Sequence, residues 1–454
     1  MASAESGAKP VAGNGARRLL SIGTVALVVG VAVAAALAAW LAPASLAEKD
    51  FVALAAGVIF AGSYLALAVG RIPFLVIDRA GVALVGACLM VLSGALPLED
   101  AYRAINLDTI TLLLGTMIVV ANLRLSGFFA IATAWAARRA HAPIVLLAAV
   151  TAVSGLFSAF LVNDAICVVL TPIVLDVTLA LNRRPVPYLL AVAMASNVGS
   201  TATITGNPQN MMIGSFSGIG YGHFAAVLAP VAAAGLVLTV ALIALAHRSE
   251  FLVADRIAAE TRRVRANRTL VVRSLLAAAA MVALFFGGQP PAKAAITIGG
   301  LLLLTRRVRS ARVYAEIDWS LLLMFAGLFI IVAGAQKMLL TPSVVEAVGG
   351  LHLERLPMLS GATAVLSNIV SNVPAVLVLK PFVQTLPDPS RAWLTVAMAA
   401  TLAGNFSILG SIANLIVVQR AAARGVAIGF WQYFIVGAPL TVLTIAVGTW
   451  WLMR

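Results

Sequence analysis

One short stretch of the chain concentrates side chains that could bind a small ligand. Residues 196–210 read SNVGSTATITGNPQN, and nine of these fifteen side chains are polar. Gly199, Gly206 and Pro208 interrupt the backbone hydrogen bonding of a helix and so release carbonyl and amide groups. Freed carbonyl, hydroxyl and amide oxygens suit sodium, whereas freed amide N–H groups suit anions. The stretch therefore predicts an ion or polar-solute site at a broken helix.

The expected geometry of this break places a helix end at the ligand. Asn207 is a good N-cap and Pro208 a good first helical residue, so a half-helix should begin there with the positive end of its dipole toward the site. We expect this stretch to contribute the following site residues: Ser196, Asn197, Gly199, Thr201, Thr203, Gly206, Asn207, Pro208 and Asn210.

A matching break follows in the second half of the chain. The sequence GNPQN at 206–210 aligns with GSIAN at 410–414, and Ser411 takes the place of the cap Asn207. The preceding residues, AGNFS at 403–407, supply another glycine and further polar side chains. The second break should contribute these site residues: Asn405, Ser407, Gly410, Ser411 and Asn414.

Two other blocks recur at nearly the same separation. LVNDA at 161–165 aligns with VSNVP at 370–374, and Gly115 aligns with Gly327. Three blocks in the same order and in approximate register predict an internal duplication.

The apolar runs 142–181 and 357–386 each predict a helical hairpin with a polar tip. Arginines flank the first run on both sides, so it should open toward the cytoplasm, while the weakly charged flanks of the second place its opening outside. The alternative is two ordinary hairpins that cross completely, since arms of about 18 residues nearly span a bilayer. The tips should add the following residues, with the two asparagines as N-caps of the return arms: Asn163, Asp164, Ser371, Asn372 and Pro374.

Asp164 and Lys380 are charged residues within these runs. A carboxylate at membrane depth is costly and usually functional, so Asp164 could carry a proton or neutralise a bound cation. If the hairpin crosses completely, Asp164 instead meets outside water. Lys380 could balance Asp164, attract an anion, or extend its ammonium group to the outer interface.

The composition places all these residues in a lipid bilayer. Of the 454 residues, 62% are hydrophobic and only 11% are charged, and the mean hydropathy is +1.03. A soluble protein of this size would not have so apolar a surface. The net charge of +14 resides in the gaps between apolar runs, where it sets topology, so nucleic acid is not an expected partner. Two cysteines are too few for a disulfide framework or a zinc site.

The charged gaps and the duplication predict the architecture. We expect an all-α polytopic membrane protein with about 11 transmembrane helices in two inverted-topology repeats, each with a re-entrant hairpin and a broken helix. The N-terminus should be cytoplasmic, in the cell (inner) membrane. The expected parts are a disordered tail (1–16), an extra first span (17–50), repeat 1 (51–247), a cytoplasmic arginine-rich linker (248–269) and repeat 2 (270–454).

At these motifs the sequence resembles the ion transporter superfamily, which includes divalent anion/sodium symporters, citrate transporters and arsenite permeases. Val162-Asn163-Asp164 with Pro172 resembles the hairpin motif of the symporters, and Gly206-Asn207-Pro208-Gln209-Asn210 resembles their broken-helix motif. The resemblance implies a homodimer in which a transport part moves against a rigid scaffold. Asp164 and Val373 replace the threonine of the symporter hairpins, so one sodium-ligating hydroxyl is missing, and Asn163-Asp164 resembles the arsenite permeases instead.

The predicted function is therefore an ion-coupled permease for a small inorganic or organic anion or a metalloid oxyanion. It needs no cofactor and no structural metal, and the coupling ion is Na⁺ or H⁺. A sodium/proton antiporter of the same fold, with Asp164 as the exchanging carboxylate, is the alternative. An intramembrane enzyme would need a catalytic constellation at depth, such as paired aspartates or an H-E-x-x-H helix, and the sequence contains none.

Overall fold

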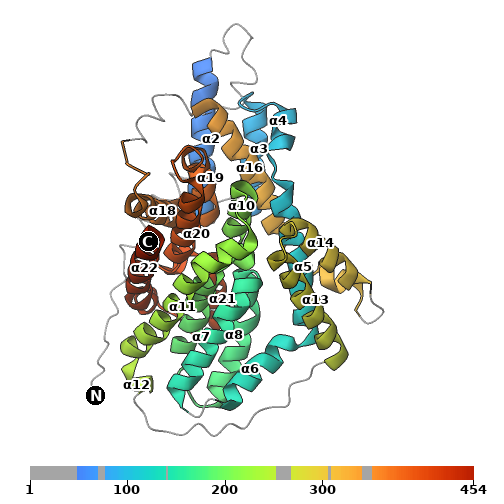
Figure 1. Ribbon diagram of the computed structural model, residues 1–454, viewed down its shortest axis with the longest axis vertical. Helices are drawn as coiled ribbons and strands as arrows, with labels where there is room; N and C mark the ends of the chain where they lie inside the picture. The colour runs from blue at the N-terminus through green and yellow to red at the C-terminus, as the bar shows by residue number, and fades with distance from the viewer. Residues whose placement is uncertain (1–48, 70–76, 140–141, 252–266, 305–307, 340–349) are drawn as a thin grey trace, which may run out of the picture. The chain divides into compact units, whose positions relative to one another are not determined.

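The computed structural model describes residues 49–69, 77–139, 142–251, 267–304, 308–339 and 350–454 (Figure 1). Their regular elements are all helices. The predicted tail and nearly all of the predicted first span lie outside the described residues, as does most of the predicted linker.

Seven helices of the described part are long and apolar enough to cross a membrane. They are α5 (Leu107–Ser126), α7 (Pro143–Phe160), α8 (Asn163–Ala180), α11 (Tyr221–Ala246), α13 (Arg268–Phe286), α16 (Trp319–Leu339) and α22 (Phe430–Met453).

Further helices complete the described fold. These are α2 (Lys49–Val69), α3 (Arg79–Leu92), α4 (Leu98–Ala104), α6 (Phe128–Arg139), α9 (Pro185–Ser200), α10 (Pro208–Ser217), α12 (Arg248–Phe251), α14 (Pro291–Leu303), α15 (Ser310–Tyr314), α18 (Leu356–Val370), α19 (Asn372–Val383), α20 (Pro389–Ala403) and α21 (Ile412–Ala422), with 3₁₀ turns η1 (Ile204–Gly206) and η2 (Ile408–Gly410).

The elements recur in the same order along the chain. The first residues of α9 and α20 are as far apart in the sequence as those of η1 and η2 and those of α10 and α21. The helices α3, α4 and α5 likewise precede α14, α15 and α16 by one constant interval. The helices α8 and α19, which start at Asn163 and Asn372, are separated by an interval of intermediate length. A duplicated sequence accounts for this recurrence because equivalent caps and glycines end equivalent helices.

The chain divides into two compact units. Of the described residues, unit 1 holds those from 49 to 105 and from 323 to 339, and unit 2 holds those from 106 to 322 and from 350 to 454. In unit 1, Gly327 of α16 lies against the backbone of Ala83 in α3, where an added Cβ would come within 2.6 Å of it. An exposed ion pair joins Lys337 Nζ to Asp100 Oδ2 at 2.9 Å.

The core of unit 2 is built around α9 and α20. Every residue of α9 from Pro187 to Ser200, and every residue of α20 from Ala392 to Ala403, is buried. Burial on every side shows that other parts of the protein enclose both stretches. Gly199 lets α9 approach α7, because a Cβ at that position would lie 2.1 Å from the carbonyl oxygen of Gly155.

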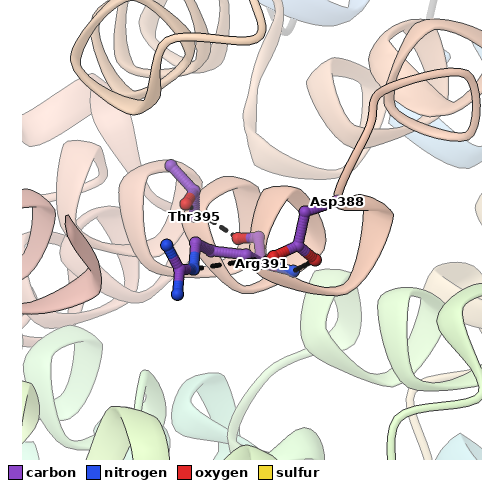
Figure 2. A network of polar contacts seen from close by, with 3 residues as sticks. All are labelled: Asp388, Arg391 and Thr395. Atoms are coloured by element: carbon purple, nitrogen blue, oxygen red, sulfur yellow. Dashed lines mark hydrogen bonds and ion pairs between the residues drawn. The ribbon is translucent and has the colours of Figure 1, made fainter. Parts of the chain in front are cut away.

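The start of α20 is fixed by a local polar network (Figure 2). The Asp388 carboxylate caps the helix by accepting a hydrogen bond from the Arg391 amide at 3.0 Å, and it also lies 3.6 Å from Arg391 Nε. Thr395 Oγ1 donates to the Arg391 carbonyl at 2.9 Å. Asp388 therefore marks the point where the chain turns from the surface into the buried helix.

The hairpin arms differ in length between the two copies. The arms α7 and α8 have 18 residues each, whereas α18 has 15 and α19 only 12. A 12-residue helix is about 18 Å long, well short of the roughly 30 Å hydrocarbon layer. The lengths therefore disfavour a complete crossing by the second hairpin.

Candidate substrate and ion site

The first break separates α9 from α10. The helix α9 ends at Ser200, the 3₁₀ turn η1 follows, and α10 starts at Pro208. Asn207 caps α10, since its Oδ1 accepts a hydrogen bond from the Asn210 amide at 2.9 Å. The predicted half-helix with Asn207 as its cap and Pro208 as its first residue is confirmed.

The second break, between α20 and α21, has the same construction. The helix α20 ends at Ala403, η2 follows, and α21 starts at Ile412. Ser411 caps α21, with its Oγ accepting a hydrogen bond from the Ala413 amide at 3.2 Å. The predicted cap is confirmed here also.

In each break one asparagine side chain satisfies the backbone carbonyls that the break releases. Asn210 Nδ2 donates to the carbonyl oxygens of Ser200 at 3.1 Å and Thr203 at 3.0 Å. The carbonyls at the equivalent positions of the second break, those of Gly404 and Ser407, accept hydrogen bonds from Asn414 Nδ2 at 2.7 and 3.1 Å. Buried carbonyls need such partners because lipid supplies none.

The two breaks are also bonded crosswise. Asn197 Nδ2 donates to Asn414 Oδ1 at 3.0 Å and to Asn405 Oδ1 at 2.9 Å. Thr401 occupies the position equivalent to Asn197, and its Oγ1 donates to Asn210 Oδ1 at 3.4 Å. All of these side chains are at most 1% exposed. Each half of the chain thus bonds to the break of the other half.

The first hairpin tip joins this network. Asn163 Nδ2 donates to Asn197 Oδ1 at 3.0 Å, and Ser411 Oγ donates to the same oxygen at 3.1 Å. Leu161, Val162 and Asn163 are no more than 5% exposed, so the tip is enclosed by protein.

The second hairpin tip lies against the second break. Asn372 Nδ2 is 3.4 Å from the position that a Cβ on Gly404 would occupy, and the Gly404 carbonyl is bonded to Asn414. The four predicted asparagines at positions 163, 210, 372 and 414 therefore belong to one polar cluster in unit 2.

The predicted capping of the return arms by Asn163 and Asn372 is wrong. The N-caps of α8 and α19 are Val162 and Ser371, and neither makes a side-chain capping hydrogen bond. The two asparagines are instead the first residues of these helices, so the turns fall at Leu161-Val162 and at Ser371. Their side-chain amides make other bonds: Asn163 donates to Asn197 in α9, and Asn372 accepts from Ser367 Oγ, at 2.5 Å, in the other arm of its own hairpin.

The remaining predicted residues surround the cluster. Ser196 Oγ contacts Cys167 Sγ at 3.0 Å, Thr201 Oγ1 donates to the Asn197 carbonyl at 3.2 Å, and Thr203 Oγ1 donates to the Ala159 carbonyl. Pro374 is buried in α19. Gly206 and Gly410 allow each break to pack against the end of the preceding helix. A Cβ on Gly206 would lie 2.1 Å from the Ser200 carbonyl oxygen, and a Cβ on Gly410 would lie 2.8 Å from the Gly404 carbonyl oxygen.

Lys380 has a partner that the sequence did not indicate. Its ammonium group lies 4.1 Å from the centroid of the Phe216 ring in α10, and that ring packs against Trp393 with centroids 6.2 Å apart. This cation–π contact ties α19 to α10.

Asp164 lines a cavity of about 110 Å³. The cavity runs from Val162, the N-cap of α8, along that helix to Val169 and along α5 from Met117 to Arg124, and α21 contributes Ile416. Glu316 and Asp318, which precede α16, also line it, and Arg124 forms an ion pair with Glu316. The charged residues of the lining are thus three acidic residues and one arginine.

A pair of oxygens differs between the two hairpins. In the first, Ser158 Oγ and Asn163 Oδ1 are buried without a hydrogen-bond partner among the described residues. In the second, the equivalent Ser367 Oγ donates to Asn372 Oδ1 and to the Ala400 carbonyl, the latter at 3.1 Å. Unpaired buried oxygens are costly, so a cation or a water that binds them would be stabilising.

Comparison with known proteins assigns the family. The family model described as citrate transporter, CitMHS, matches residues 64–388. The chain belongs to the citrate transporter family. It is therefore a multi-pass membrane transporter and not an enzyme.

Relatives cover nearly the whole chain. An uncharacterized transporter of Mycobacterium bovis is 30% identical over 413 residues, which span 86% of this chain and 95% of the relative. The silicon efflux transporter LSI3 of Oryza sativa subsp. japonica is 29% identical over 449 residues, 83% of this chain and 93% of the relative. The fold resembles the crystal structure of the Alcanivorax borkumensis YdaH transporter, with a TM-score of 0.52, 16% identity, and coverage of 88% and 97%.

Sequence reasoning missed several residues of this transporter's polar region. Thr401 could have been found by extending the alignment of the two breaks back to Asn197, and Ser158 and Ser367 by extending the hairpin alignment toward the N-terminus. Arg124, Glu316 and Asp318 gave no local signal, because they lie at helix ends where charged residues are ordinary. Only folding brings them to the same cavity as Asp164.

Proposed function

We propose that the protein is an ion-coupled secondary transporter that moves a small anion or metalloid oxyanion by alternating access. The observation that carries the proposal is the crosswise bonding of the two broken segments, Asn197 to Asn414 and Thr401 to Asn210. A solute that enters between the breaks would exchange these neutral hydrogen bonds for its own. Its binding is thereby coupled to the relative position of the two halves.

The chemistry of the site favours a solute that is uncharged or weakly charged. The crosswise bonds use amides and a hydroxyl, which recognise hydroxyl groups and oxygens without requiring full charge. The neighbouring cavity carries three carboxylates against one arginine, which would repel a trianion such as citrate. An undissociated metalloid acid fits both features, and a relative is named as a silicon efflux transporter.

The first hairpin supplies the proposed coupling chemistry. Asp164 would take up and release a proton or balance a cation, and the unpaired oxygens of Ser158 and Asn163 would accept a hard cation such as Na⁺. The equivalent second-hairpin residues are unsuited, since Val373 replaces the carboxylate and Ser367 is already bonded to Asn372.

Transport by purified protein in proteoliposomes tests the proposal. Arsenite, germanic acid as a silicic acid analogue, sulfate, a dicarboxylate and citrate are offered under an imposed sodium gradient, an imposed proton gradient, or neither. We expect the metalloid acids to move fastest, with acceleration by one of the two gradients. If no solute moves faster than in protein-free vesicles under any gradient, the proposal is overturned. Sodium-dependent proton flux that needs no solute would identify the antiporter instead.

Asp164→Asn and Asp176→Asn form a matched pair on α8. Asp176 lies about three turns further along the helix, with a largely exposed side chain paired to Arg424. We expect Asp164→Asn to abolish gradient-driven transport while the protein remains folded, and Asp176→Asn to transport normally. Wild-type rates in Asp164→Asn would remove that residue from the mechanism.

We also propose the finer points of assembly and orientation. The arginine-rich gaps favour a cytoplasmic N-terminus in the cell membrane, and the family resemblance favours a homodimer. Reporter fusions at position 248 and at the C-terminus should report opposite sides, the first inside. Light scattering in detergent should give the mass of two chains, and a monomer mass would contradict the dimer.

A further inference from the structure

Three hydroxyl groups of α7 are buried without a hydrogen-bond partner among the described residues. They belong to Thr151, Ser154 and Ser158, each of which is at most 2% exposed. Spacings of three and four residues place them on one face of the helix, about 4.5 and 6 Å apart along its axis. This row runs toward the hairpin tip, where Asn163 Oδ1 is unpaired as well. Buried hydroxyls without partners are costly, so a ligand that bonds them would be stabilising.

Buried threonines on neighbouring helices are paired in a simpler way. Thr171 Oγ1, in the other arm of the same hairpin, donates to the Cys167 carbonyl at 2.6 Å. Thr239 Oγ1 in α11 donates to the Gly235 carbonyl at 2.7 Å. Such bonds to the same helix satisfy a buried hydroxyl without any ligand. The hydroxyls of the α7 row make no such bonds, so both their donor and their acceptor capacity remain for another molecule.

The second copy of the hairpin pairs one of these positions with protein. Ser360 is the residue equivalent to Thr151, and it shares a hydrogen bond of 2.8 Å with Thr449 Oγ1. Val240 occupies the position of Thr449 in the first copy. Thr151 therefore lacks the hydroxyl that serves its equivalent, and the first hairpin leaves open to a small ligand what the second closes with a side chain.

A small cavity continues the row toward the base of the hairpin. It has a volume of about 10 Å³ and lies among α6, α7 and α8, which pack against one another (Figure 1). Its polar lining residues are Ser154, Thr133 of α6 and Thr178 of α8. Because α8 ends at Ala180, Thr178 lies at the end of the arm that is remote from the tip. A cavity of this size holds about one water molecule.

The chemistry of the lining suits water better than an ion. Thr133 and Thr178 donate to carbonyls of their own helices at 2.9 and 3.0 Å, so their oxygens remain as acceptors. A water can donate to both oxygens and accept from Ser154. The cavity lining contains no charged side chain that would compensate an ion. Along the row, one water can bridge two hydroxyls that are about 4.5 to 6 Å apart, since each hydrogen bond spans about 2.8 Å.

We propose that the first hairpin holds a file of water molecules along α7, from the cavity at Thr178 to the tip at Asn163, and that this water file conducts protons from the base of the hairpin to its tip. Each oxygen accepts one proton and releases another, so only O–H bonds form and break. The proton passes to the carboxylate of Asp164, the residue that follows Asn163. The inference rests on the proposed coupling role of Asp164, and it selects H⁺ as the coupling ion.

Radiolytic labelling in ¹⁸O-water tests whether the water is bound. Radiolysis of a bound water produces a hydroxyl radical in place, which oxidises the side chains beside it even where bulk radicals do not reach. In protein reconstituted in lipid, we expect ¹⁸O in Leu146 and Leu170, which line the cavity and are 1% exposed. Leu228 of α11, which is fully buried, should remain unlabelled. The absence of label from both cavity leucines would overturn the water file.

Ser154→Ala removes the hydroxyl that joins the row to the cavity. The loss of one hydrogen bond should lower the occupancy of the water, and with it the labelling of Leu170, by about fivefold. Arsenite uptake driven by a proton gradient should fall by a similar factor. Arsenite exchange at equal pH, which moves no net protons, should keep the wild-type rate. Unchanged labelling, or equal losses in uptake and exchange, would contradict the proposal.

The melting temperature of Ser154→Ala gives an independent reading. If water bonds the hydroxyl, the variant loses those bonds and should melt below the wild type. Removal of a hydroxyl that has no partner at all would relieve a buried polar group and raise the melting temperature. A more stable variant therefore speaks against bound water.

Thr151→Val and Thr171→Val are a matched pair in the two arms of the hairpin. Both remove a buried hydroxyl by the same change, but the hydroxyl of Thr171 bonds its own helix. Thr151→Val should reduce proton-driven uptake, and Thr171→Val should not. Equal uptake in the two variants, or wild-type uptake that a sodium gradient alone drives, overturns the proton path. If the cavity leucines are labelled but arsenite neither accumulates nor exchanges, the proposed transport function fails and not the bound water.

Discussion

The two broken segments have the same backbone arrangement, whereas the two hairpins beside them differ in their side chains. In both, a buried helix ends, a 3₁₀ turn follows, a capped half-helix begins, and an asparagine bonds the released carbonyls. The hairpins beside them have diverged. The first has Asp164 and an unpaired Ser158–Asn163 oxygen pair, while the second has Val373 and a closed Ser367–Asn372 bond.

This difference shows how two copies with the same backbone arrangement can acquire different functions. The glycines and caps that form the breaks are retained in both copies because the backbone geometry depends on them. The hairpin side chains carry no such constraint, so a carboxylate can replace a neutral residue in one copy without altering the backbone of the breaks. We therefore expect substitutions of the break glycines and caps to affect folding in both copies. Substitutions in the hairpins should affect ion chemistry in the first copy.

The largest effect on folding is expected from substituting Gly206 and Gly410, the glycines of the two breaks. Gly206→Ala would place a Cβ 2.1 Å from the Ser200 carbonyl oxygen, and Gly410→Ala would place one 2.8 Å from that of Gly404. The first variant should fail to give folded protein, and the second should lose about 1–3 kcal/mol of stability. Size-exclusion profiles and thermal unfolding measure this. Gly361→Ala in α18, where nothing lies within 4 Å, should be stabilised by up to about 1 kcal/mol. Equal behaviour of all three would contradict the close approach.

The next largest effects on the free energy of unfolding are expected from removing the crosswise hydrogen bonds, and the two variants should differ in size. Asn197→Ala leaves Asn163, Asn405 and Asn414 without a shared buried partner, whereas Thr401→Val removes one hydroxyl. The first should cost about 3 kcal/mol or more in the free energy of unfolding and the second about 1–2 kcal/mol.

Thr239→Val is the comparison for both crosswise variants. Its hydroxyl is as buried but bonds only the Gly235 carbonyl of its own helix, so its loss should cost less than about 1 kcal/mol. Denaturant titration in mixed micelles measures the free energy of unfolding of the three variants. A cost for Asn197→Ala no greater than that for Thr239→Val would show that the crosswise bonds do not hold the halves.

Smaller changes in stability, opposite in sign, are expected from glycine substitutions at the two hairpin tips. Ser371 has φ +77° and ψ 160°, a conformation that favours glycine, whereas the equivalent Val162 has φ −42°. Ser371→Gly should therefore raise stability by about 1 kcal/mol, and Val162→Gly should lower it by about 2 kcal/mol through lost burial and gained chain entropy. Shifts in melting temperature of the same sign would contradict the difference between the tips.

The smallest expected effect concerns an ion pair in unit 1, between Asp100 of the first copy and Lys337 of the second, which the equivalent residues Arg312 and Leu125 cannot form. Lys337 lowers the pKa of Asp100 through a hydrogen bond and its charge, while the residue equivalent to Asp100 in the second copy is Arg312. Because the folded pKa is depressed, the stabilisation is present above the ordinary value of about 3.9 and is lost as the pH falls through the folded value. Lys337→Met should melt slightly below the wild type at pH 6 and converge with it in acid. A difference that persists in acid would show that the pair acts through packing.

The breaks and their caps could be predicted from the sequence because their causes are local. Gly206, Asn207, Pro208 and Ser411 determine where a helix ends and the next begins, whatever surrounds them. The hairpin caps were predicted wrongly for the opposite reason. Asparagine is a good cap in isolation, but Asn163 bonds Asn197 of another helix, which no local rule reveals, and Asn372 bonds Ser367 across the tip of its own hairpin.

The sequence by itself determined that the chain is an apolar helical protein with two similar halves, because hydrophobicity and helix-breaking residues act within a few positions of themselves. Only the tertiary structure decided that each half bonds to the break of the other, that Asp164 shares a cavity with Arg124 and Glu316, and that Lys380 lies on Phe216. Most of those contacts join residues from opposite halves of the chain. Which residues meet over such separations depends on helix packing and burial, and not on sequence spacing.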